Sequence, residues 1–302
     1  PVFRRGGFDL QVGNPPWVRP DFDEAATLAE IDVTWALESK IATDRARKLR
    51  EATLAQQDAR DYFLSELESV VATRELVSFP QFYPHLVGLR PDLYRCFMEQ
   101  AWRNASTRGV TALIHLESHF TDDKAGLLRE QTYQRLRRHW QFINELKLFE
   151  IQDQKTFGVN IYGSAKEPGF LHAVSLYHPE TVIRSLRHDG TGPEPGIKDD
   201  EGKWDLRPHS ARIMVVDDRV LQSWAELVEG DRTVGRRTRM VYTVNRSVSD
   251  VLTKLTNAPR VGDLKPRFSL GWHESIDRKK GYFDISWGTV PDWGDAILQG
   301  PH

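Results

Sequence analysis

The residues with the clearest chemical meaning in this chain form the tetrapeptide Asn14-Pro15-Pro16-Trp17. It directly follows the stretch 8–13, in which apolar and polar residues alternate as in a β-strand. Each proline fixes φ near about −65° and removes a backbone N–H, and Pro15 also keeps Asn14 out of the helical region. The pattern predicts a stiff turn at the carboxyl end of a strand, the edge at which open α/β sheets bind ligands.

Such a turn presents two hydrogen-bond acceptors beside an aromatic ring. The side-chain oxygen of Asn14 and the carbonyl oxygen of Pro15 can each accept one hydrogen of an amino group. The amino group of a nucleobase is a poor nucleophile because its lone pair is delocalised, and two such bonds raise the electron density on its nitrogen. Trp17 offers a face on which a base can stack, a contact typically worth ~1–3 kcal/mol. The alternative interpretation is a proline-rich turn that performs no chemistry.

Asn-Pro-Pro-aromatic after a strand resembles the catalytic motif of amino-group DNA methyltransferases, chiefly the adenine-N6 enzymes. The resemblance implies transfer of a methyl group from S-adenosylmethionine to adenine in double-stranded DNA, without a metal. It implies that the catalytic residues are Asn14, Pro15, Pro16 and Trp17. The main alternative is a protein-glutamine methyltransferase, since those enzymes use Asn-Pro-Pro-Tyr on a primary amide.

A second match to the same family lies further along the chain. Phe157, in Thr156-Phe157-Gly158-Val159, resembles the aromatic residue that contacts the flipped base from its other side. Tyr162 is an alternative for this substrate-binding role. The resemblance therefore implies that a base is held between Trp17 and a second aromatic ring.

The order of the predicted elements indicates an α/β fold. It is the order expected for the second half of a doubly wound, Rossmann-like methyltransferase sheet, with a helical insertion at about 21–79 and a mixed α/β extension. The insertion is an amphipathic helical hairpin by its spacing, and its place after the turn also suits a lid or a DNA contact. Beyond it we expect a helix after Asp92, strands at 109–116 and 143–151, a helix at 124–140 between them, and a strand pair at 159–162 and 170–177.

Residues 187–203 are rich in glycine, proline and acidic residues and predict a linker. It would separate a catalytic domain, residues 1–186, from residues 204–302, the start of a DNA target-recognition region. The net charge of −2 gives no overall nucleic-acid signature, so positive charge must be concentrated locally. Residues 231–280 hold twelve lysines and arginines against five acidic residues. The alternative is a solvated basic face, and the candidate DNA-binding residues are Arg236, Arg237, Arg239, Lys265, Arg267, Arg278, Lys279 and Lys280.

The sequence lacks one part that such an enzyme needs. No glycine-rich strand–turn–helix for the cofactor occurs before or after the turn, nor an acidic residue placed to bind its ribose. We therefore expect an internal, inactive fragment of a large cytoplasmic bacterial methyltransferase of a restriction–modification or phage-defence system, with restriction or defence subunits as possible partners. A non-catalytic DNA-binding subunit that retains a methylase fold is a further alternative.

Other classes of protein find little support in the sequence. The single cysteine, Cys96, excludes an internal disulfide and argues against a structural zinc site. No apolar run approaches 18 residues, and no signal peptide is visible. Glu117-Ser118-His119 and the nearby His115 lie at the end of a predicted strand, but the Gly-x-Ser-x-Gly elbow of a hydrolase is absent. No metal-ligand spacing of histidines is present either.

Overall fold

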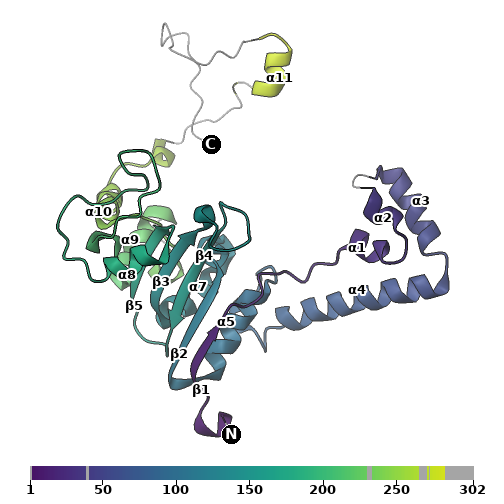
Figure 1. The fold of residues 1–302 in the computed structure, drawn as a ribbon, viewed down its shortest axis with the longest axis horizontal. Helices are drawn as coiled ribbons and strands as arrows, with labels where there is room; N and C mark the ends of the chain where they lie inside the picture. Colours follow the sequence, from purple (N-terminus) through teal and green to yellow (C-terminus); the bar gives the residue numbers. More distant parts are fainter. Residues whose placement is uncertain (1, 39–40, 230–232, 265–270, 272, 283–302) are drawn as a thin grey trace. The chain divides into compact units, whose positions relative to one another are not determined.

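The computed structural model describes residues 2–38, 41–229, 233–264, 271 and 273–282 (Figure 1). The chain divides into two compact units, Pro1–Asn257 and Ala258–His302. The linker predicted at residues 187–203 therefore lies inside the first unit. The physical reason is that the strand that follows it is hydrogen-bonded into the same sheet as the preceding ones.

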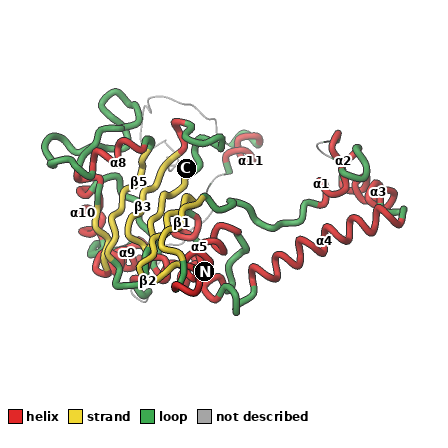
Figure 2. The backbone as a smooth tube through the Cα atoms, turned by 60° about the horizontal axis from the view of Figure 1, so that its bottom comes forward, coloured by secondary structure: helices red, strands yellow, loops and turns green. Residues whose placement is uncertain are grey.

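The first unit is built on a six-stranded mixed sheet in the order β1-β2-β4-β3-β5-β6. β1 is parallel to β2 and β3 is parallel to β5, whereas β4 runs antiparallel between β2 and β3, and β6 runs antiparallel to β5. β1 forms one edge of the sheet (Figure 2). The strands are β1 (Phe8–Gly13), β2 (Ala105–Leu116), β3 (Leu136–Ile143), β4 (Thr156–Tyr162), β5 (Gly169–Leu176) and β6 (Met214–Asp217).

Helices cover both faces of this sheet. One face packs on α5, α7 and α9 through a large aromatic and aliphatic core that includes Tyr94, Tyr133 and Trp224. The opposite face packs on α8 through Val182 and on the loop residues around Trp17. The α-helices are α1 (Glu24–Ala29), α2 (Thr34–Leu37), α3 (Thr43–Thr53), α4 (Gln57–Ser78), α5 (Leu93–Asn104), α6 (Ser118–Thr121), α7 (Gly126–Arg135), α8 (Pro179–Ser185), α9 (Asp218–Val228), α10 (Arg246–Leu255) and α11 (Glu274–Lys279).

Short 3-10 helices occur at several connections. They are η1 (Phe3–Arg5), η2 (Pro84–Leu86), η3 (Asp123–Ala125), η4 (Asn144–Leu146), η5 (Ser210–Arg212), η6 (Gly235–Arg237) and η7 (Val261–Leu264). Within the described residues, no helix combines the length and the apolar character of a membrane span.

The predicted helical region 21–79 forms four helices, α1 to α4. Phe22 packs edge-on against Phe63 with the ring centroids 5.3 Å apart, and Arg50 Nη2 lies 2.5 Å from Glu24 Oε2. Short interhelical contacts of this kind tie α1, α3 and α4 together. The region therefore has its own small set of internal contacts.

Two expectations about strands are wrong. The third strand is residues 136–143 and not 143–151, because His139 and Gln141 are polar residues buried inside the sheet and disguise the strand in the sequence. The strands β4 and β5 do not pair with each other. Each pairs with β3 instead, which places them on opposite sides of it.

Candidate functional site

The Asn14–Trp17 turn begins directly after Gly13, the last residue of β1. Gly13 pairs with Leu113 of the parallel strand β2, so the carboxyl ends of both strands lie at the same end of the sheet. Asn14 is exposed at this edge and Pro15 is buried. In the part of the chain that is described, no group bonds the amide of Asn14, so its oxygen is available to a ligand.

The chain that follows the turn is fastened to the start of α5. The backbone N–H of Leu93 donates to the carbonyl of Val18 over 3.0 Å, and Arg19 Nε lies 3.5 Å from Asp92 Oδ2. Burial raises the pKa of Asp92, and the charges of Arg95 and Arg19 oppose this effect. The turn is thus held on one side by β1 and on the other by α5.

Trp17 belongs to an aromatic cluster beside the turn. Its indole N–H donates to the carbonyl of Ile114 over 3.3 Å. Its ring stacks on Phe157 with the centroids 6.1 Å apart and the planes at 29°, and Phe149 packs edge-on against both rings. A base between two facing rings needs about 7 Å, which is two carbon–carbon contacts of about 3.5 Å. The rings of Trp17 and Phe157 are therefore too close together to hold a base between them. A base can contact both rings only after they separate.

Asn144 holds the loop that carries Phe149. Asn144 is fully buried, and its Nδ2 donates to the carbonyls of Phe149 and Ile151, both over 3.0 Å. Its Oδ1 accepts the N–H of Phe149, also over 3.0 Å. The Asn144 side chain thus makes the hydrogen bonds to backbone groups of this loop that a neighbouring strand would otherwise make. Neither Asn144 nor Phe149 was predicted from the sequence. An asparagine just before an apolar run is a signal for such a loop, because its side chain can hydrogen-bond nearby backbone groups.

Tyr162 lies away from the turn. Phe157 pairs with Leu116 near the carboxyl end of β2, whereas Tyr162 pairs with Thr111, five positions along β4 or about 16 Å at 3.3 Å per residue. Tyr162 is fully buried, and its hydroxyl lies 2.7 Å from His115 Nε2. The structure therefore brings Phe157, and not Tyr162, beside Trp17.

A network of buried polar residues lies between the sheet and its helices. Glu117 directly follows β2, and its Oε2 accepts bonds from Tyr242 Oη over 3.0 Å and from His139 Nε2 over 2.8 Å. His139 Nδ1 lies 2.8 Å from Nδ1 of His172, whose pKa is lowered well below 6.5 by burial. No group of three or more histidine, cysteine or acidic side chains is arranged to hold a metal ion, as far as the chain is described.

The predicted DNA-binding residues fall into three groups by their place in the structure. Arg236, Arg237 and Arg239 lie in the first unit and form ion pairs there, with Asp218, Glu130 and Glu229 respectively, over 2.7 to 2.8 Å.

Lys265 and Arg267 fall outside the described residues. Arg278, Lys279 and Lys280 lie at the end of α11 in the second unit, where Lys280 Nζ is 3.9 Å from Asp277 Oδ1. The positive charge counted along residues 231–280 is therefore divided between two units, and Arg236, Arg237 and Arg239 are paired with acidic residues within the first unit.

No protein-family model matches the chain, and no curated protein matches it. Solved structures that resemble it are a DNA-bound ATP-dependent Type ISP restriction-modification enzyme LlaBIII, the type IIG restriction endonuclease BpuSI and the Type I restriction enzyme EcoKI M protein. Their sequence identities are 13%, 15% and 12%, and their TM-scores are 0.32, 0.31 and 0.30. The matches cover 65%, 53% and 65% of this chain but 12%, 21% and 48% of those chains. TM-scores near 0.3 do not establish a shared function.

Proposed function

We propose that this chain is part of an S-adenosylmethionine-dependent DNA adenine-N6 methyltransferase of a restriction–modification or phage-defence system. One observation carries the proposal. The Asn14–Trp17 turn directly follows the edge strand β1, at the end of the sheet where the parallel strands β1 and β2 finish. The Asn14 amide has no hydrogen-bond partner among the described residues, and an aromatic cluster lies beside the turn.

The proposed roles follow from the chemistry of these groups. Asn14 Oδ1 and the Pro15 carbonyl accept the two hydrogens of the adenine amino group, which localises its lone pair and orients it. The ring of Trp17 stacks on the base. Phe157 packs against the Trp17 ring and contacts the base only after the two rings separate. Extruding the base from the duplex costs a few kcal/mol, which stacking and phosphate contacts must offset.

Among the described residues, none form a glycine-rich site for the proposed cofactor. When bound, S-adenosylmethionine supplies the methyl group. Yet no glycine-rich turn joins a strand to a helix in the described structure, and the sequence has none elsewhere. We therefore place the cofactor cradle on residues outside this chain.

The unpaired edge strand supports the proposal that the cofactor cradle lies outside this chain. β1 pairs with β2 alone among the described strands, and its Leu10 and Val12 side chains are 65% and 74% exposed. An unpaired edge with exposed apolar side chains is normally covered in a finished fold. Further strands that hold the cofactor would pair with β1 and bury these side chains.

The test is Asn14→Ala in the full-length protein, with DNA methylation followed by mass spectrometry of digested DNA. We expect a loss of about 100-fold or more, as when a contact made in the transition state is removed. Asn14→Asp keeps an oxygen acceptor at the same place and should lose less. An unchanged rate in Asn14→Ala would show that the turn is not catalytic.

The two competing functions predict different outcomes of the same digest. A protein-glutamine methyltransferase would leave DNA unmodified and methylate a glutamine in a protein substrate. A non-catalytic DNA-binding subunit would modify neither, while still binding DNA. The basic and aromatic residues after position 258 argue against the first alternative, and the intact Asn14–Trp17 turn argues against the second.

A further inference from the structure

A pocket of about 250 Å³ lies at the end of the sheet opposite the Asn14 turn. β1 and β2 begin at this end, and β4, which is antiparallel to β2, finishes there. The pocket is lined by residues just before β1, at the start of β2 and just after β4, together with side chains of α5 and α7. These residues are Gly6, Trp102, Ala105, Ser106, Thr107, Gly109, Thr111, Arg135, Tyr162, Gly163, Ser164 and Ala165.

The lining has the composition of an anion site. It contains one guanidinium group, five hydroxyl-bearing residues and an indole, but no carboxylate. The five glycine and alanine positions keep the space open. Three of the hydroxyls already donate within the protein: Ser106 to Asp9 Oδ1 over 3.0 Å, Tyr162 to His115 Nε2 over 2.7 Å, and Ser164 to the carbonyl of Thr107. The strongest remaining donors are those of Arg135 and Trp102.

Arg135 is a partly buried cation without an acidic partner. Its guanidinium lies over the Trp102 ring, 5.2 Å from the centroid, and its Nη1 donates to the carbonyl and side-chain oxygens of Gln131 over 3.1 and 2.7 Å. It forms no ion pair with any described carboxylate. Burial lowers its pKa, and the charge of Glu99 opposes this effect. Nε and Nη2 are therefore donors that an anion can use.

Trp102, which also lines the pocket, carries another donor without a partner. Its indole Nε1 is buried and has no hydrogen-bond partner among the described residues. Burying an N–H without a hydrogen-bond partner is unfavourable, and a bound acceptor that reaches it would offset this cost. The two unsatisfied donor groups belong to residues already in contact through the cation–π pair.

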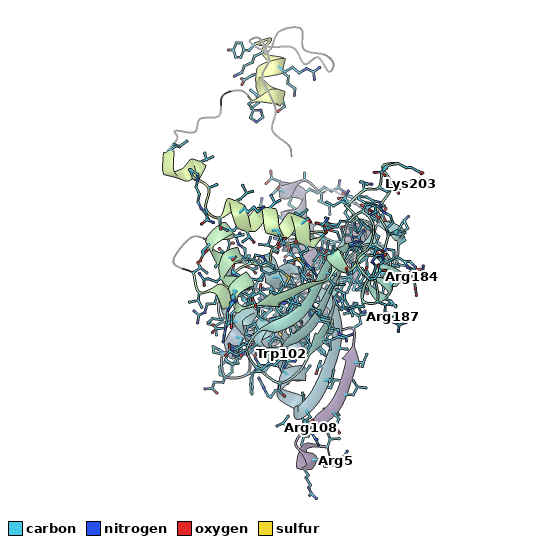
Figure 3. All side chains as sticks on the ribbon, turned by 90° about the vertical axis from the view of Figure 1, so that its left-hand side faces the viewer. Arg5, Trp102, Arg108, Arg184, Arg187 and Lys203 are labelled. Atoms are coloured by element: carbon cyan, nitrogen blue, oxygen red, sulfur yellow. The ribbon has the colours of Figure 1, made fainter. Side chains whose placement is uncertain are left out.

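Further cations lie at the same end of the sheet as the pocket. Figure 3 shows Arg5 and Arg108 at the end of the sheet where β1 and β2 begin. Arg137 donates to the carbonyl of Ser164, beside Gly163 of the lining. None of these three arginines pairs with an acidic residue within the described structure. Their combined field attracts a negatively charged ligand.

We propose that this pocket binds a phosphate group, carried by a nucleotide or by the end of a nucleic-acid strand. A planar guanidinium fork suits phosphate oxygens, and unsatisfied N–H donors suit an acceptor that carries no hydrogen. A volume of about 250 Å³ is small for a ligand pocket, so it admits one phosphate and part of what carries it, and not a duplex. The site is independent of the proposed methyl-transfer site.

The test uses the 302-residue chain labelled with ¹⁵N at its indole nitrogens. Inorganic phosphate, at millimolar concentration, should shift the Trp102 indole resonance, which is assigned by its absence in Trp102→Phe. Arg135→Gln should weaken binding by about tenfold or more, and Arg187→Gln should leave it unchanged. Arg187 is an exposed cation elsewhere in the first unit (Figure 3).

A second variant covers the case in which Arg135→Gln does not fold. Thr107 is exposed at the rim, so Thr107→Glu places a carboxylate there without altering the core, and it should abolish binding. No shift of the Trp102 resonance, or an equal affinity in the native chain and in both variants, would overturn the proposal.

Two further titrations identify the carrier. A nucleoside monophosphate that binds more tightly than inorganic phosphate indicates a nucleotide. A 5′-phosphorylated single strand that binds while its 5′-hydroxyl counterpart does not indicates a nucleic-acid end. None of these results depends on methyl transfer, so failure here and failure of the proposed function are distinguishable.

Discussion

Lowering the pH from 7 to 5 should destabilise the first unit because it contains buried histidines that fold in the neutral form. His115 is the clearest case. It is fully buried, and desolvation lowers its pKa to about 4 from the ordinary 6.5. Its Nδ1 lies 2.9 Å from the carbonyl of Leu116, which can only accept, so Nδ1 carries the hydrogen. Nε2 then accepts from the hydroxyl of Tyr162, and protonation at Nε2 would abolish that bond.

The sign and size of the effect follow from the pKa values. Since the folded pKa of His115 is below the unfolded one, the stabilisation is complete above about pH 6.5 and is lost as the pH falls toward 4. At about 1.4 kcal/mol per pKa unit, the difference between the folded and unfolded pKa values corresponds to about 3 kcal/mol of free energy of unfolding. About 2 kcal/mol of this is lost by pH 5. Burial also lowers the pKa values of His119 and His172, so both act in the same direction. A domain with a stability of about 5–15 kcal/mol should show this clearly.

The assay is urea unfolding at several pH values between 7 and 5, followed by circular dichroism. His115→Gln retains hydrogen-bonding capacity at this position but does not titrate, so its free energy of unfolding should depend less steeply on pH than that of the native chain. His178→Gln changes an exposed histidine and is the matched control. The reasoning is refuted if the native chain is equally stable at pH 7 and pH 5, or if His115→Gln keeps the native pH dependence.

Three other predictions concern packing, charge and the missing cofactor cradle. Gly158→Ala should lower the free energy of unfolding by about 1–3 kcal/mol, because the added Cβ would collide with Glu117 Oε1, whereas Gly169→Ala meets no atom within 4 Å and should be neutral by thermal unfolding. Asp205→Asn should cost about 3–5 kcal/mol in urea unfolding, since it leaves the fully buried Arg212 without its charge partner at 3.6 Å; a near-neutral effect would contradict this pairing. Calorimetry of the 302-residue chain should detect no micromolar binding of S-adenosylmethionine, and tight binding would show that a complete cofactor site is present.

The sequence by itself determined the features that depend on neighbouring residues. A strand at residues 8–13 and the stiff turn after it follow from local alternation and from two prolines, and the structure has β1 at those residues. The helix after Asp92 also follows from local periodicity, and it is observed as α5. These elements are set by interactions that lie close together in the chain.

Tertiary structure decided what depends on distant partners. β4 is inserted between β2 and β3, a pairing that no local pattern specifies, and it brings Phe157 beside Trp17. β3 itself escaped prediction because its polar residues are satisfied by partners from other strands, as His139 is by His172.

The use of charged residues was likewise decided by the fold. A count along residues 231–280 indicates a basic region, but Arg237 is neutralised by Glu130, more than a hundred positions away. Conversely, Arg135 lies in an ordinary stretch of sequence and becomes a cation without an acidic partner in a pocket. A charge acts through the groups around it, and these are brought together only when the chain folds.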